Sequence, residues 1–159
     1  MEKIKDANTI RLIERIGEHY RANISNRFLR PIILQLPLDK NTWDQIELFT
    51  EKLELFRYQG YHLDELYRQI AASTRFVVAA RQTIPTLKSR LSANASGQER
   101  VLRDMAANNF VSNLQLFADM LNDLYSFLIE IDIKAAGRSL PVYSQMPEMI
   151  DISRQLAGK

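Results

Sequence analysis

The stretch Gln98–Ala136, QERVLRDMAANNFVSNLQLFADMLNDLYSFLIEIDIKAA, decides the fold because it contains neither glycine nor proline. Its apolar residues recur at alternating steps of three and four, which is the heptad pattern of a helix with one buried seam. At about 1.5 Å per residue this helix would be about 60 Å long. The residues of the predicted seam are Ala107, Phe110, Leu114, Phe117, Leu121, Leu124, Leu128, Ile131 and Ala135.

A second long helix is predicted at about residues 63–93, again from a seven-residue repeat. The repeat places Leu63, Ile70, Val77, Ile84 and Leu91 on one line, and Leu66, Ser73, Ala80 and Leu87 three residues later. Pro85 lies inside this helix and is expected to kink it, because proline removes a backbone hydrogen bond. The two long helices are joined by a short loop, so the sequence predicts an all-α, up-down antiparallel bundle with coiled-coil-like packing.

Shorter helices are predicted at about 2–29 and 43–58, with Thr42 as the N-cap of the second. Gly17 lies beside the apolar stripe of the first, where we expect close approach by a neighbouring helix. Residues 1–137 are expected to form the bundle. Residues 138–159 should form a tail with a short helix after Pro147, packed on the bundle or on a partner.

Composition favours one folded domain. The chain has 159 residues, of which 46% are apolar and 25% charged, and it has no cysteine. The lack of cysteine suits a reducing compartment, so we expect a cytoplasmic protein. The N-terminus has no apolar segment of a signal peptide, and no apolar run approaches the ~20 residues that span a bilayer, so membrane insertion is not expected.

No pattern of catalytic residues is found. There are only two histidines, His19 and His62, and the pair His62 and Glu65 has no counterpart that would complete a metal site. Glycine-rich phosphate loops are absent. The carboxylates of the last long helix, including Asp132, are expected to face solvent. We therefore predict a non-enzyme with no metal, cofactor or small-molecule substrate.

The function is predicted from the length of the helix at 98–136, which exceeds that of its neighbours. Its seam must be covered by the tail, by a second copy or by another protein, because large apolar patches are unusual on monomers. The hypothesis is a non-enzymatic helical adaptor or assembly protein, with a homodimer favoured and another protein as the alternative partner. The predicted partner-binding residues are Tyr125, Phe127, Ile131, Ile133, Leu140, Val142, Tyr143 and Met149.

An alternative hypothesis is binding of RNA or DNA backbones by the basic face of the helix predicted at 63–93, which is the third helix along the chain. Residues 68–103 carry seven Lys or Arg and one Asp or Glu, and arginine suits phosphate. Residues 104–136 carry one basic and five acidic residues, so these charges also suit pairing of the two helices. The residues of this alternative are Arg68, Arg75, Arg81, Lys88 and Arg90.

Overall fold

A computed structural model shows an all-helical bundle in its described part, which comprises residues 4, 6–49, 59–92 and 95–158. Side chains at 84, 85, 87, 88 and 90–92 also lie outside the description. The elements are α1 (Ala7–Ile24), α2 (Arg30–Ile33), α3 (Lys40–Glu47), α5 (Leu63–Ser92), α6 (Gly97–Ala136), the 3-10 helices η1 (Val142–Gln145) and η2 (Pro147–Met149), and α7 (Ile152–Leu156).

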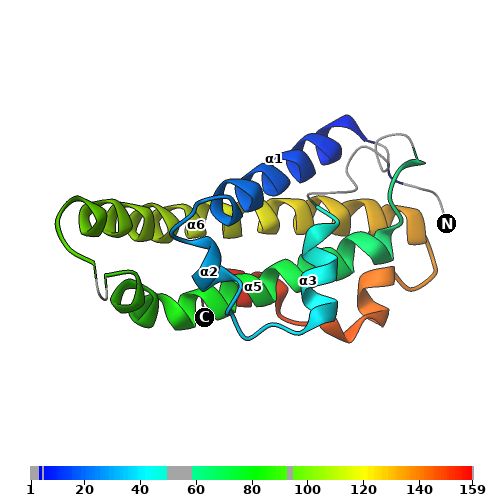
Figure 1. Ribbon diagram of the computed structural model, residues 1–159. Coiled ribbons are helices and arrows are strands. Elements are labelled where there is room, and N and C mark those ends of the chain that lie inside the picture. Colours follow the sequence, from blue (N-terminus) through cyan, green and yellow to red (C-terminus); the bar gives the residue numbers. More distant parts are fainter. Residues whose placement is uncertain (1–3, 5, 50–58, 93–94, 159) are drawn as a thin grey trace.

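The two long helices are confirmed and form the frame of the molecule. α5 and α6 lie side by side and are joined at one end of the molecule (Figure 1). The seam of α6 is buried from Ala107 to Leu128, where each of its residues is at most 4% exposed. In α5 the seam is buried from Leu63 to Ala80, and its later residues lie outside the described side chains. α5 continues through Pro85, and the kink there stays a prediction.

The first helix is shorter than predicted. α1 begins after Asp6, whose carboxylate accepts hydrogen bonds from the Thr9 N–H (3.0 Å) and hydroxyl (3.1 Å). Before it, Ile4 forms an isolated antiparallel β-bridge with Tyr61 through two backbone hydrogen bonds, so Ile4 is not part of the helix. After it, the Asn26 side chain accepts from two backbone N–H groups and forms a turn in place of helix.

The up-down order is not confirmed, because α3 lies across α5 instead of alongside it (Figure 1). α3 also begins earlier than predicted. Its N-cap is Asp39, whose carboxylate accepts from the Thr42 N–H at 2.7 Å, so Thr42 lies inside the helix. The predicted end of this helix falls at 50–58, outside the described residues.

Gly17 lies at a close approach between α1 and the segment that follows α3. A Cβ atom at this position would collide with the backbone carbonyl oxygen of Phe49. The close approach predicted for Gly17 is therefore present, although the neighbour is the chain just beyond a helix end. Behind it, the Tyr20 ring packs edge-on against Phe76 (5.2 Å between centroids) and Phe117 (4.6 Å), which joins α1 to both long helices.

Candidate functional site

The C-terminal tail is anchored on a buried carboxylate. Asp132 of α6 is 1% exposed and accepts three hydrogen bonds of 2.9 Å, from the Tyr67 hydroxyl and from the N–H groups of Val142 and Tyr143. Those two N–H groups belong to the first two residues of η1. The amino end of a helical turn favours negative charge, so this position suits the Asp132 carboxylate. The expectation that Asp132 faces solvent was wrong, because the tail folds over it.

Tyr67 is held in its protonated form. Burial raises its pKa, and so do the hydrogen bond to Asp132 and the negative charge of that carboxylate. The hydroxyl therefore stays a donor to the carboxylate. Tyr125, two helical turns before Asp132 on α6, donates from its hydroxyl to the Met149 carbonyl oxygen at 3.4 Å, and burial raises its pKa as well.

Apolar side chains and one arginine complete the attachment of the tail. Met149, Ile152 and Leu156 are each at most 4% exposed, and α7 packs against both α5 and α6. Arg81 of α5 donates to the carbonyl oxygens of Gln155 (2.9 Å) and Leu156 (2.7 Å). A cation at these last carbonyls stabilises the end of α7.

The predicted partner-binding residues divide into two groups. Tyr125, Val142, Tyr143 and Met149 meet where the tail contacts the bundle, and Ile131 is half-buried beside the core. Three others face outward: Phe127 is 44%, Ile133 51% and Leu140 73% exposed. Because the chain covers most of its own seam, the length of that seam no longer supports association.

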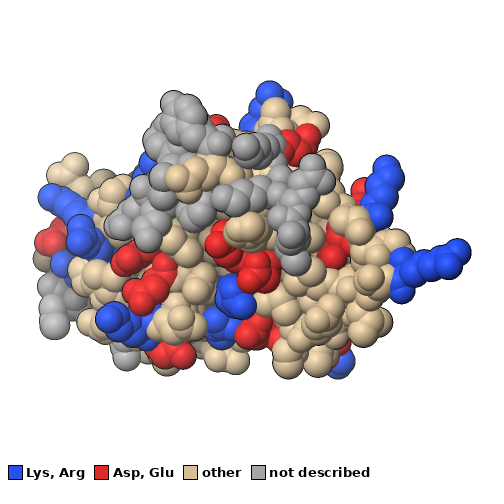
Figure 2. Space-filling view, turned by 90° about the vertical axis from the view of Figure 1, so that its right-hand side faces the viewer, with Lys and Arg blue, Asp and Glu red and all other residues tan. Residues whose placement is uncertain are grey.

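The basic residues of α5 are largely engaged within the chain. Arg68 pairs with Asp64 (3.1 Å), and Arg75 donates to the Thr42 hydroxyl (3.0 Å). Both arginines line a polar groove of about 610 Å³ that Asp39 and Glu148 also line. Figure 2 shows the face that lies on the right-hand side of Figure 1, and acidic and basic side chains are interspersed across it. The side chains of Lys88 and Arg90 are outside the description.

The hairpin tip, by which we mean the first nine residues of α6 and the facing end of α5, was not predicted from the sequence. Here the two long helices continue past α1 and α2 (Figure 1). Three apolar side chains of α6 are exposed within about one turn: Val101 by 56%, Leu102 by 40% and Met105 by 55%. They lie outside the heptad seam. A group of apolar residues outside the seam is the sequence signal that could have predicted this surface.

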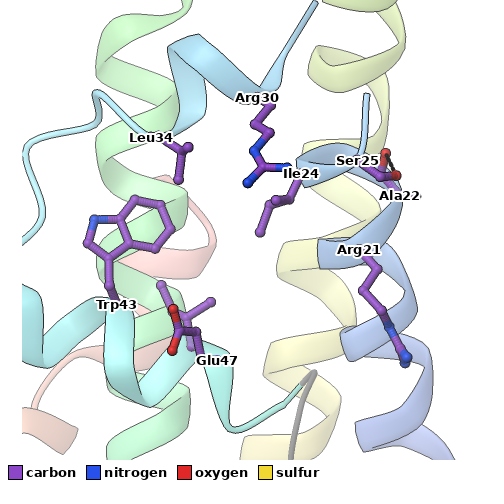
Figure 3. Close-up of a pocket in the computed structure, with 9 residues that line it drawn as sticks. Arg21, Ala22, Ile24, Ser25, Arg30, Leu34, Trp43 and Glu47 are labelled. Atoms are coloured by element: carbon purple, nitrogen blue, oxygen red, sulfur yellow. Dashed lines mark hydrogen bonds between the residues drawn. The ribbon is translucent and has the colours of Figure 1, made fainter. Parts of the chain in front are cut away.

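A second missed feature is a cavity of about 620 Å³ between α1, α2 and α3. Its lining residues are Arg21, Ala22, Ile24, Ser25, Arg30, Leu34, Trp43, Ile46 and Glu47. In Figure 3, Arg30 and Ile24 point into the gap between α1 and Trp43, whereas Arg21 extends along α1 away from Trp43. The residues come from three helices that are separate in the sequence, so no local motif marks the cavity.

The described part of the chain has neither a metal site nor a membrane-spanning helix. No three His, Asp or Glu side chains there lie together in a way that could hold a metal ion. None of the described helices combines the length and the apolar character needed to cross a membrane.

Comparison with protein-family models, with curated proteins and with solved structures gave no match. The surfaces and the cavity of the molecule therefore carry the information about its function.

Proposed function

We propose that this protein is a non-enzymatic helical assembly module that self-associates through the hairpin tip. The observation that supports the proposal is the exposure of Val101, Leu102 and Met105 at the one end of the helix pair that no third described helix covers. Two helices bury only the stripes that face each other, so the outer face of such a pair stays in contact with water. Apolar residues on that face favour a protein contact.

A second copy of the chain is the occupant that suits the tip best. Two tips packed against each other would form a four-helix arrangement, in which each pair covers the open face of the other. The rim carries exposed charges of both signs, because Glu99 and Arg100 come directly before the apolar side chains. In a two-fold dimer the same patch meets itself, so a rim of mixed sign allows opposite charges to pair.

The other surfaces support association less well. At the opposite end of α6 the tail already occupies the bundle, and the nearby exposed residues Ile133 and Leu140 flank that intramolecular contact. Binding of nucleic acid loses support because Arg68, Arg75 and Arg81 contact other groups of the chain. The proposed location is the cytoplasm, which suits a chain without cysteine.

Analytical ultracentrifugation over a range of protein concentrations tests this proposal. We expect a reversible dimer for the natural chain and a monomer for the triple variant Val101→Gln, Leu102→Gln, Met105→Gln. Exposed positions tolerate such changes within about 0.5 kcal/mol, so the fold should persist in circular dichroism.

The matched control changes the exposed residues at the other end, Phe127→Gln, Ile133→Gln and Leu140→Gln. This variant should dimerise as the natural chain does. A natural chain that stays monomeric at every concentration contradicts self-association. Loss of the dimer in the control, with retention in the tip variant, would move the interface to the tail end.

A further inference from the structure

The cavity between α1, α2 and α3 has the size of a small-molecule site. Its volume of about 620 Å³ lies within the ~300–1,000 Å³ that is usual for such sites. Ile24, Leu34 and Ile46 supply apolar walls. Leu34 is 52% exposed, which is high for a large apolar side chain that lines a hollow.

Trp43 forms the flat side of this cavity. Its indole ring is partly exposed, and it packs edge-on against Phe76 of α5 at 6.3 Å between centroids, which fixes its orientation. The remaining surface of the ring lines the cavity. A flat apolar group lying against the indole would gain both burial and an aromatic contact.

Arg30 gives the cavity its charge preference. Its guanidinium points into the gap (Figure 3) and forms no hydrogen bond or ion pair with any described residue. Glu47 lies toward the opposite end of the cavity, below Trp43 in the same view. An anionic group would therefore bind at the Arg30 end, and a second anionic group at the far end would meet a carboxylate.

We infer that this cavity binds a small monoanionic molecule with a flat apolar body, which lies against Trp43 while its carboxylate or sulfonate pairs with Arg30. The inference goes beyond the proposed self-association and does not depend on it, because the cavity and the hairpin tip share no residue. It describes binding of a ligand and involves no chemical step.

A pair of fluorescent probes tests the inference on the full chain. Anilinonaphthalene sulfonate carries one anionic group, and N-phenylnaphthylamine has the same aromatic body without it. Trp43 is the only tryptophan of the chain, so energy transfer from it reports that the probe is bound to the protein, and the variants below locate the bound probe. We expect saturable transfer to both probes and tighter binding of the sulfonate.

The decisive variant is Arg30→Gln. It should weaken sulfonate binding about tenfold, because a charge-assisted hydrogen bond is lost, and leave N-phenylnaphthylamine unchanged within about twofold. Leu34→Glu, which places an anion in the apolar wall, should weaken both probes. Arg11→Gln, an exposed cation on the outer face of α1, serves as the matched control and should change neither.

Three results would overturn the inference. One is transfer from Trp43 that does not saturate. Another is equal weakening of both probes by Arg30→Gln while its circular dichroism matches that of the natural chain. The third is equal weakening of sulfonate binding by Arg11→Gln and Arg30→Gln, which would indicate a general charge effect.

Discussion

The two ends of the α5–α6 pair have similar heptad sequences and different surroundings. Asp132 at the tail end, together with Arg81 and the apolar side chains of α7 near the middle of the pair, attaches residues 138–158 to the bundle. At the hairpin tip, the same pair of helices leaves Val101, Leu102 and Met105 exposed. One end is thus covered by its own chain, and the other is open.

The difference teaches that a heptad repeat predicts burial but does not identify the covering element. At the tail end the cover is held by a few polar contacts with exact geometry, because Asp132 supplies acceptors for three separate donors. The open end has no described counterpart of this carboxylate. Changes at the tail end should therefore affect stability, and changes at the tip should affect association.

The largest expected effect comes from Asp132→Ala, which removes the attachment of the tail. It leaves the N–H groups of Val142 and Tyr143 without acceptors and leaves the Tyr67 hydroxyl only the more distant Leu128 carbonyl oxygen at 3.3 Å, at a cost of about 3–5 kcal/mol in the free energy of unfolding. Urea unfolding followed by circular dichroism measures the loss. Trypsin should then cut at Arg138 and Arg154 faster than in the natural chain, since a detached tail exposes both bonds.

The control for this change is Asp123→Ala, an exposed carboxylate on the same helix. It should alter the free energy of unfolding by no more than about 0.5 kcal/mol. Equal urea midpoints for Asp132→Ala and Asp123→Ala would show that the buried carboxylate does not hold the tail, and the contrast between the two ends would lose its basis.

The pH dependence of the free energy of unfolding also distinguishes the two ends. Tyr67 contacts Asp132 at the tail end, whereas the first nine residues of α6 at the tip contain no tyrosine. The pKa of Tyr67 is raised in the folded chain by burial and by Asp132, while in the unfolded chain it returns to about 10. Above that pH the unfolded chain releases a proton that the folded chain keeps. The contribution of Tyr67 to the free energy of unfolding is therefore complete below about pH 10 and decreases as the pH rises above it.

For one tyrosine the slope above pH 10 approaches about 1.4 kcal/mol per pH unit. The variant Tyr67→Phe should lose this share of the alkaline dependence, as measured by urea midpoints on either side of pH 10. Burial also raises the pKa of Tyr20, so part of the slope should remain in the variant. An unchanged slope in Tyr67→Phe would contradict the assignment.

The smallest expected effect is a gain in stability from a substitution at a buried polar residue of α5. Gln69 of α5 is 0% exposed, and its side-chain amide forms no hydrogen bond with any described residue. Gln69→Met keeps the approximate shape and removes the desolvated amide, so we expect stabilisation of about 1–2 kcal/mol. The same change at the exposed Gln82 should be neutral. Destabilisation by Gln69→Met would indicate that the amide is satisfied.

The parts of the fold that could be predicted are those with a long local signal. The long helix at 97–136 differs from its prediction by one residue at the start, because thirty-nine consecutive residues lack a helix breaker. The ends of α1 and α3 were wrong, because Asp6, Asn26 and Asp39 form local side-chain hydrogen bonds that compete with the apolar pattern. Such bonds depend on backbone conformation as well as residue type.

The candidate sites were less predictable than the helices. Phe127, Ile133 and Leu140 are exposed as a docking surface requires, but Tyr125, Val142 and Tyr143 take part in the contact between the tail and the bundle. The cavity beside Trp43 and Arg30 was missed, because its walls come from helices that are far apart in the chain. Proximity of this kind has no periodic signature.

The sequence by itself determined the helical class, the two long helices and the stripe that each one buries, because helix periodicity acts between residues three or four apart. Only the tertiary structure decided that Asp132 is buried, that the tail returns to the bundle and that the hairpin tip stays open. These features depend on contacts between distant segments, whose free energies are set by geometry that no single stretch of sequence contains.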